Sequence, residues 1–378
     1  MKTDFALCAP MFSETGYGNH SREIYRALKR AGWRVNLFSM EDPRKYDNSN
    51  KHEIYPELVA DIAELKRQPC IHIQPPPNTV IGSAYDILYT TFESATLHPG
   101  AVNRLRLFKE VWVPCKYNLK AIKKAKVMRM PAYVMPEGVD TNIYKPGYPG
   151  TEKYKYHNYF KVLYIGDWSQ RKGVEKLIKA FQTADLGRPG MLTMKVNYQG
   201  DNDIHSRAVM NCDCIKWKNE VEQVGVKNIK LVKDFVSNEE LVKMYNTADV
   251  YAILTMGEGW SLTVSQAMAC GVPVITTNAS GHLDFCSKST TGLVKVEKWG
   301  PMDHQETVEV DFYKNQLFAH PDQKNAKHWL EHLCRNPQKA RRMGERGMQR
   351  IREKYTWDKS AETIGKRMKK ILGKMGKF

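Results

Sequence analysis

The sequence predicts an α/β protein built from two Rossmann-like domains. Its 378 residues are too many for one ordinary hydrophobic core and suit two domains. Short apolar segments alternate with helical patterns along most of the chain, as a parallel sheet covered by helices requires. Residues 144–160 are rich in Gly, Pro and Tyr and lack apolar periodicity. We therefore expect this stretch to link two series of strands and helices.

The first series opens with an expected strand at residues 4–10, followed by a loop and a helix over residues 16–32. Residues 42–51 are polar and contain Pro43 with several Asn and Lys, which is typical of a surface loop. Further buried strands are expected at residues 35–39, 71–74, 86–92, 110–114 and 132–136.

The second series starts after the linker and ends in helices. Strands are expected at residues 161–166, 191–198, 228–232, 249–255 and 272–277. From residue 321 onward the periodicity is helical, with expected helices over residues 322–334, 336–355 and 358–372.

The composition is that of a soluble globular protein, with 42% hydrophobic and 26% charged residues. No run approaches the 18 or more apolar residues of a membrane span, and the first ten residues do not resemble a signal peptide. We therefore expect a cytoplasmic protein, either free or held at a membrane surface. The eight cysteines are scattered, apart from Cys212 and Cys214. They are expected to be reduced thiols, and no metal site is expected.

The formal net charge of +17 predicts a positive field that attracts anionic partners. Phosphates, anionic lipid and nucleic acid all fit that field. Basic helical segments near residues 341–352 and 366–377 contribute to it. The last segment also fits a basic amphipathic helix at an anionic membrane, and its alternative is a closing helix with lysines in water.

The most specific chemical signal is residues 257–281, GEGWSLTVSQAMACGVPVITTNASG. An expected strand ends at about Thr255, a glycine-bearing loop follows, and a helix is expected to begin near Thr263. Ligands of open α/β sheets bind beyond the carboxyl ends of the strands. The helix N-terminus offers free N–H groups to an anion. Glu258 lies in the loop, where a carboxylate can accept hydrogen bonds from sugar hydroxyls.

This segment resembles the signature of the family 4 glycosyltransferases, in which Glu, seven residues and a second Glu precede AMACGVPVI. Other segments resemble the family in the same order: residues 16–32, 110–118, 135–147, 164–181, 236–255 and 355–364. The resemblance spans most of the chain and is weaker over residues 51–84 and 198–223. An ordered set of segments is far more specific than any one motif.

The resemblance implies the GT-B architecture, with two Rossmann-like domains facing a central cleft and a C-terminal helix crossing back. The implied divisions are an acceptor-side domain over residues 1–155, a nucleotide-sugar domain over residues 156–352, and a returning helix over residues 353–378. It also implies transfer of a sugar from a nucleoside diphosphate to an acceptor hydroxyl, with retention at the anomeric carbon. The nucleotide sugar is then a substrate, and no cofactor and no metal are required.

Without a metal, the leaving diphosphate needs a cationic site. The resemblance gives this role to Lys172 and Arg171, whose side chains both favour phosphate oxygens. Glu258 would bind the donor sugar's hydroxyls. The remaining expected donor-binding residues are Gly16, Gly18, Phe235, Val236, Gly259, Trp260, Ser261, Leu262 and Gln266.

Two residues depart from the family pattern. The second acidic residue is replaced by Gln266, and Asp167 stands where many members carry an Arg. A neutral amide can still bind a ribose hydroxyl but lacks the strength of a carboxylate. Residues 90–100 resemble a subgroup pattern in which Glu93 or His98 would contact the acceptor hydroxyl. For His98 an ordinary loop histidine is the favoured interpretation, and for Glu93 the two interpretations are balanced.

Three functions remain open from the sequence. The first is a glycosyltransferase acting on a glycan, a lipid-linked or a small acceptor. The second is the same chemistry on hydroxylated bases of DNA, suggested by the charge of +17. The third is a catalytically impaired protein that binds a sugar nucleotide or glycan, suggested by Asp167 and Gln266. The donor sugar, its base, the acceptor and the oligomeric state are not determined by the sequence.

Overall fold

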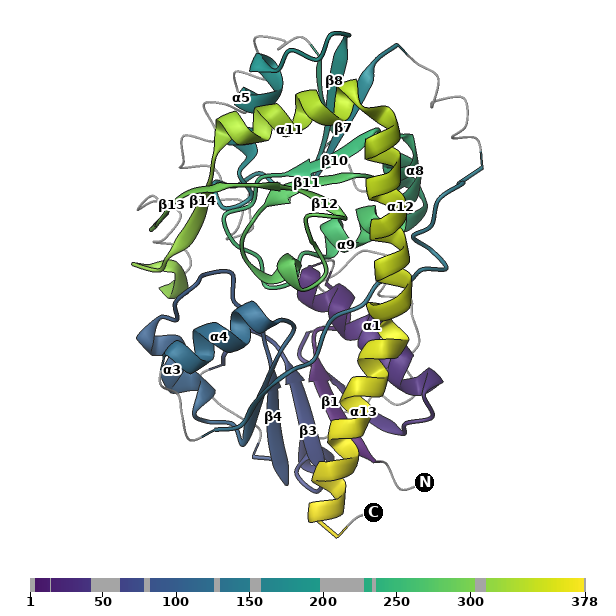
Figure 1. Ribbon diagram of the computed structural model, residues 1–378. Coiled ribbons are helices and arrows are strands. Elements are labelled where there is room, and N and C mark those ends of the chain that lie inside the picture. Colours follow the sequence, from purple (N-terminus) through teal and green to yellow (C-terminus); the bar gives the residue numbers. More distant parts are fainter. Residues whose placement is uncertain are drawn as a thin grey trace. The chain divides into compact units, whose positions relative to one another are not determined.

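The computed structural model describes residues 4–13, 15–41, 62–77, 82–125, 130–149, 158–197, 228–232, 236–302 and 311–376. The chain divides into two compact units (Figure 1). Unit 1 comprises Met1–Phe92, Pro99–Gly138 and Tyr355–Phe378. Unit 2 comprises Glu93–His98 and Val139–Lys354.

Unit 1 contains a six-stranded parallel sheet in the order β2-β1-β3-β4-β5-β6. The strands are nearly continuous apolar runs, because both faces of such a sheet are covered. Their bounds are β1 Phe5–Ala9, β2 Val35–Ser39, β3 Pro69–Ile73, β4 Tyr85–Tyr89, β5 Glu110–Val113 and β6 Ala132–Val134. The helices are α1 Gly16–Arg30, α2 Ile62–Leu65, α3 Pro99–Leu105 and α4 Lys116–Lys124.

The C-terminal helix α13 (Trp357–Lys374) belongs to unit 1 and packs against α1, as the resemblance implied. In Figure 1 the two helices lie side by side. Arg367 donates two hydrogen bonds to the carboxylate of Glu110, at 2.9 and 2.5 Å. Glu110 is fully buried on β5 and also accepts from Trp112 Nε1. This ion pair therefore fastens the end of the chain to the sheet formed by its beginning.

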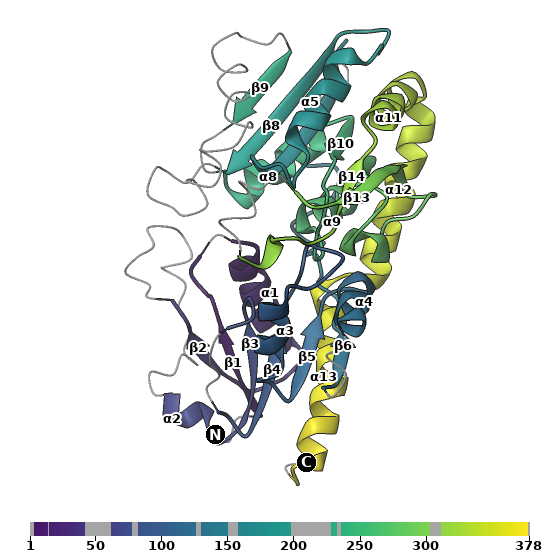
Figure 2. The same ribbon diagram turned by 90° about the vertical axis from the view of Figure 1, so that its left-hand side faces the viewer.

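Unit 2 contains a second parallel sheet in the order β12-β11-β10-β7-β8-β9. When the strands of this sheet are renumbered in chain order from β7, their order from β9 to β12 is 3-2-1-4-5-6. This is the strand order of the Rossmann fold. Figure 2 shows β8 and β9 side by side at one edge. The bounds are β7 Phe160–Asp167, β8 Gly190–Asn197, β9 Ile229–Val232, β10 Val250–Ile253, β11 Val274–Thr277 and β12 Thr291–Val294.

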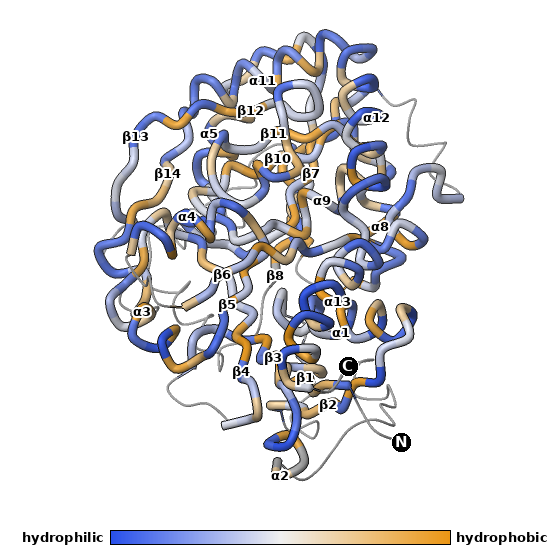
Figure 3. Tube along the Cα trace, turned by 60° about the horizontal axis from the view of Figure 1, so that its bottom comes forward, coloured by the Kyte–Doolittle hydropathy of each residue, from blue (hydrophilic) through white to orange (hydrophobic). Residues whose placement is uncertain are grey.

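The longer helices of unit 2 are amphipathic and bury one face each, whereas the short helix Leu262–Ala269 is buried throughout Val264–Ala269. Their bounds are α5 Val174–Thr183, α8 Asn238–Thr247, α9 Leu262–Ala269, α11 Gln323–Arg335 and α12 Pro337–Lys354, with short 3-10 helices η4 Gly281–Asp284 and η5 Asp311–Tyr313. Hydrophilic and hydrophobic residues alternate along α11 and α12 (Figure 3), and these helices pack against α5 and α9 respectively.

Three strands of unit 2 were not expected from the sequence. β12 extends the parallel sheet, and β13 (Val296–Gly300) pairs antiparallel with β14 (Phe318–Pro321). Gly292 within β12 lies under Trp329, where an added Cβ would meet the indole ring at 3.0 Å. A glycine-bearing strand this short has little intrinsic strand preference, so tertiary packing decides its conformation.

The units change at Gly138, earlier in the chain than the expected division at residue 155, which lies outside the described residues. The reason is the packing of residues 139–149 against α8. Tyr144 contacts the Tyr245 ring at a centroid distance of 6.2 Å and donates to Asn238 Oδ1 at 3.1 Å. The last change, at Lys354, lies close to the expected residue 352.

Candidate functional site

The candidate site lies at the carboxyl ends of β7 and β10, the adjacent strands at which the order of the unit 2 sheet reverses. Arg171 and Lys172 follow β7, and Glu258 follows β10. Ligands of open α/β sheets bind at such a switch point. The two loops touch, because the Met256 N–H donates to the Arg171 carbonyl at 2.7 Å. Gly173 is left-handed (φ 68°), and a Cβ there would lie 1.9 Å from the Leu254 carbonyl oxygen.

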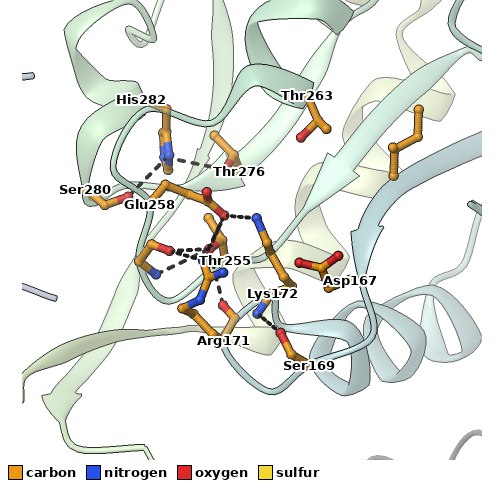
Figure 4. A network of polar contacts seen from close by, with 12 residues as sticks. Asp167, Ser169, Arg171, Lys172, Thr255, Glu258, Thr263, Thr276, Ser280 and His282 are labelled. Atoms are coloured by element: carbon orange, nitrogen blue, oxygen red, sulfur yellow. Dashed lines mark hydrogen bonds and ion pairs between the residues drawn. The ribbon is translucent and has the colours of Figure 1, made fainter. Parts of the chain in front are cut away.

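Glu258 is buried and held through one oxygen (Figure 4). Lys172 Nζ donates a hydrogen bond to Glu258 Oε1 at 2.8 Å, and Thr255 Oγ1 donates to the same oxygen at 2.9 Å. Arg171 Nη1 lies 3.6 Å from that oxygen. The side chains of Lys172 and Glu258 are only 14% and 7% exposed. The second oxygen, Oε2, accepts no hydrogen bond from any described residue, so it remains for a ligand hydroxyl.

The charge of Glu258 is preserved by its partners. Burial alone would raise the pKa of the carboxyl, because a low dielectric disfavours the ion. The charges of Lys172 and Arg171, with the hydrogen bonds from Lys172 and Thr255, outweigh burial and hold the pKa below its ordinary value. Glu258 is therefore an ionised acceptor at neutral pH.

Arg171 is anchored on the loop that carries Glu258. Its Nη1 donates to the Gly257 carbonyl at 2.9 Å. Burial would lower the pKa of the guanidinium, but Tyr313, Glu93 and Glu258 raise it. The expected pair of cations is thus present, with Lys172 bound to the carboxylate and Arg171 bound to the loop backbone.

Helix α9 begins at the same loop with an open N-terminus. Its N-cap residue Ser261 is left-handed (φ 78°) and makes no capping hydrogen bond. Ser261 Oγ is buried and has no hydrogen-bond partner among the described residues. A non-glycine residue in this conformation carries backbone strain, which gathers at functional sites. The Trp260 ring packs against the Phe285 ring, with the ring centroids 4.8 Å apart.

Gln266 is buried one turn into α9 and is held by Tyr245. The Tyr245 hydroxyl lies 3.2 Å from Gln266 Oε1 and also donates to the Thr263 carbonyl at 3.1 Å. Gln266 is 8% exposed. The amide that replaces the family's carboxylate therefore has a partner of its own within unit 2.

The far side of the Glu258 loop is formed by residues that sequence reasoning did not single out. The Gly281 N–H donates to the Glu258 carbonyl at 2.9 Å, and a Cβ on Gly281 would lie 1.9 Å from the Gly259 carbonyl oxygen. His282, which had no assigned role, is fully buried beside them, and its Nε2 lies 2.7 Å from the Thr277 carbonyl oxygen. Burial lowers the pKa of His282, so it supports the loop as a neutral ring. Only the proximity of the β10 and β11 loops reveals this.

The other expected donor-binding residues lie elsewhere in the chain. Gly16 and Gly18 belong to unit 1, at the start of α1. A Cβ on Gly18 would lie 2.1 Å from the Ser13 carbonyl oxygen, whereas Gly16 has open space. The chain itself therefore requires glycine at position 18. Val236 precedes the N-cap of α8, and Phe235 lies outside the described residues.

Neither a metal-binding cluster nor a membrane-spanning helix occurs among the described residues. No group of three His, Cys, Asp or Glu side chains that could hold a metal ion occurs among them. No helix in the described part of the chain is long and apolar enough to cross a membrane.

Comparisons with known proteins bear on the same residues. The family model "Glycosyl transferases group 1" matches residues 215–310, the range that contains the Glu258 loop and α9. The D-inositol 3-phosphate glycosyltransferase of Paenarthrobacter aurescens is 25% identical over 190 residues, covering 48% of this chain and 42% of that protein. The MMP alpha-(1->4)-mannosyltransferase of Mycolicibacterium hassiacum is 23% identical, covering 61% and 47%. The chain therefore matches less than half the length of these relatives.

Over residues 215–310 the chain matches the group 1 glycosyltransferases. Its fold agrees with solved structures over nearly the whole length. Sucrose-phosphate synthase from Thermosynechococcus elongatus gives a TM-score of 0.74 at 16% identity, covering 98% of this chain and 100% of that one. Anabaena Alr3699/HepE in complex with UDP-glucose gives 0.68 at 13% identity, covering 97% and 99%. The predicted GT-B fold is confirmed.

Proposed function

We propose that this protein transfers a sugar from a nucleoside diphosphate sugar to an acceptor hydroxyl, with retention at the anomeric carbon. The observation that carries the proposal is the buried Lys172–Glu258 ion pair at the switch point, beside the open N-terminus of α9. It brings a cation for the diphosphate and a carboxylate for the sugar into one place. The names of three relatives support the same reaction class: D-inositol 3-phosphate glycosyltransferase, MMP alpha-(1->4)-mannosyltransferase and probable sucrose-phosphate synthase.

In this proposal each group has a separate task. The ammonium of Lys172 has three N–H donors, so it can retain Glu258 Oε1 and also bind a phosphate oxygen. Glu258 Oε2 accepts a hydroxyl of the donor sugar. The free N–H groups at the start of α9 bind the phosphate as its charge grows during departure. Arg171 adds positive charge from the Gly257 side.

The leaving diphosphate is proposed to take the proton of the acceptor hydroxyl, so the reaction needs no strong base from the protein. Its charge is proposed to be neutralised by Lys172, Arg171 and α9 without a metal ion. Gln266 is proposed to lie at the ribose and Val236, with Phe235, at the base. Gly16 and Gly18 are proposed to approach the diphosphate from unit 1. These roles rest on the family resemblance.

For the acceptor we propose only a chemical class: a glycan, a lipid-linked molecule or a small molecule. The net charge of +17 supports anionic acceptors, and it equally supports attachment to an anionic membrane on the cytoplasmic side. Hydroxymethylated DNA would be shown as the acceptor by sugar transfer to a modified duplex and none to an unmodified one. Binding to both duplexes without transfer would reduce the charge to a nonspecific electrostatic effect.

The deciding experiment is a hydrolysis screen with UDP-, GDP-, ADP- and dTDP-sugars, because slow hydrolysis requires no known acceptor. Release of a nucleoside diphosphate from one donor, lost in Glu258→Gln, supports the proposal. Binding of a nucleotide sugar with no hydrolysis by the wild type would support the impaired binding protein suggested by Asp167 and Gln266. No binding of any donor would refute both.

A further inference from the structure

The segment Glu93–His98 is attached to unit 2, although the strand before it and the helix after it belong to unit 1. Two hydrogen bonds fix it to the start of β14. The Ala95 N–H donates to the Leu317 carbonyl at 2.8 Å, and the Leu317 N–H donates to Thr96 Oγ1 at 3.1 Å. The chain thus delivers the Glu93 carboxylate to the unit that holds Glu258.

Gly257 brings this segment against Arg171. A Cβ on Gly257 would lie 2.1 Å from the Glu93 carbonyl oxygen, so only glycine permits this approach. The carbonyl of the same Gly257 accepts the hydrogen bond from Arg171 Nη1 at 2.9 Å. One glycine therefore contacts the Glu93 backbone on one side and the Arg171 guanidinium on the other.

The side chain of Glu93 also has a fixed partner. The Tyr313 hydroxyl is hydrogen-bonded to the Glu93 carboxylate. Tyr313 packs edge-on against Phe318 at 5.3 Å, and Phe318 forms an apolar cluster with Met256 and Met302. Burial, the largest cause, raises the pKa of Tyr313 well above its ordinary value; the charge of Arg171 lowers it, and the carboxylates of Glu93 and Glu258 raise it further. The hydroxyl therefore remains protonated and donates to Glu93.

We propose that Glu93 is a positioning residue that, together with Tyr313, fixes the Arg171 guanidinium at the Glu258 loop. The kinetic part of this inference rests on the proposed function. A long arginine side chain loses much rotamer freedom when ordered, and a second anchor beside the Gly257 carbonyl keeps it in place before a ligand arrives. A charge that is already oriented stabilises a developing phosphate charge more effectively than one that must reorganise. Glu93 then acts through Arg171 and does not touch the acceptor.

The first test measures the position of Arg171 without any assumption about activity. The full chain and its Glu93→Gln and Tyr313→Phe variants are treated with phenylglyoxal, and labelling of each arginine is followed by peptide mass spectrometry. The Arg171 side chain is 14% exposed, whereas Arg341 is 83% exposed and serves as the internal reference. Arg171 should be labelled about fivefold faster in both variants, as expected when the Glu93 carboxylate no longer helps to hold the guanidinium in place, with Arg341 unchanged.

The outcomes are distinct. Wild-type labelling of Arg171 in both variants overturns the proposal. Faster labelling of every arginine in Glu93→Gln would show that this variant is unfolded. The labelling of Arg171 in Tyr313→Phe, which keeps the Glu93 carboxylate, then decides the test. Because labelling needs no substrate, its result stands even if the wild type hydrolyses no nucleotide sugar, which is the failure of the proposed function.

The second test is a double-mutant cycle on donor hydrolysis. Glu93→Gln should lower kcat about tenfold with little change in KM. In an Arg171→Ala background the same substitution should change kcat less than about twofold, because the group that Glu93 orients is gone. Equal effects in both backgrounds would show that Glu93 acts independently of Arg171, as an acceptor contact would, and would overturn the proposal.

Discussion

Replacing Lys172 with methionine should destabilise unit 2 through the carboxylate left behind. Glu258 is 5% exposed, and removing one partner of a buried ion pair costs about 3–5 kcal/mol. Thr255 at 2.9 Å and Arg171 at 3.6 Å remain beside the same oxygen, so we expect a cost below that range, roughly 2–3 kcal/mol. For a unit of this size that lowers Tm by about 5–10 °C.

Differential scanning calorimetry at pH 7 measures this effect in three variants. Lys172→Met/Glu258→Gln should unfold at a higher temperature than Lys172→Met alone, because the uncompensated charge has been removed. The control is Lys179→Met, which breaks the Lys179–Glu175 pair on α5, whose side chains are each 40% exposed. That pair should contribute no more than about 0.5 kcal/mol. A Tm of Lys172→Met within 1 °C of the wild type would correspond to a cost of ~0 kcal/mol and would refute the reasoning. A double variant that is no more stable than Lys172→Met would refute it as well.

The remaining predictions concern pH, donor binding, metal and the C-terminal helix. Because the folded-state pKa of Glu258 lies below its ordinary value of 4.5, the stability it contributes is present above that pH and lost as pH falls through the lower value. The Tm difference between wild type and Glu258→Gln should therefore be steady near neutrality and shrink below pH 4.5. Gln266→Glu should tighten nucleoside diphosphate binding by roughly 1 kcal/mol in calorimetric titration, whereas much weaker binding would mean that the amide donates to the ligand. Hydrolysis should survive EDTA, and loss of activity restored by Mn²⁺ or Mg²⁺ would contradict the proposed cationic site. Glu110→Gln should lower the stability of unit 1 by roughly 2–4 kcal/mol in urea unfolding, since it leaves Arg367 without its charged partner; an unchanged midpoint would refute that role.

Local patterns in the sequence were sufficient to predict the two Rossmann-like sheets apart from the edge strand β12. Strand and helix periodicity depend on which faces of a segment are buried, so they can be recognised without knowing the partners. Residues 257–266 could be predicted as a candidate site for a related reason, because a strand end, its loop and the next helix are contiguous in the chain. The loop–helix unit with Glu258, Ser261 and Gln266 is thus largely a property of the sequence.

Contacts between distant segments were decided only by the tertiary structure. Lys172 and Glu258 lie 86 residues apart and meet because β7 and β10 are neighbours in the sheet, which no periodicity reports. The pairing of Gln266 with Tyr245 depends on the packing of α8 against α9 in the same way. The attachment of Glu93–His98 to unit 2 is the clearest case. The strand before this segment belongs to unit 1, but the hydrogen bonds of Ala95 and Thr96 with Leu317 and the close approach permitted by Gly257 hold the segment in unit 2.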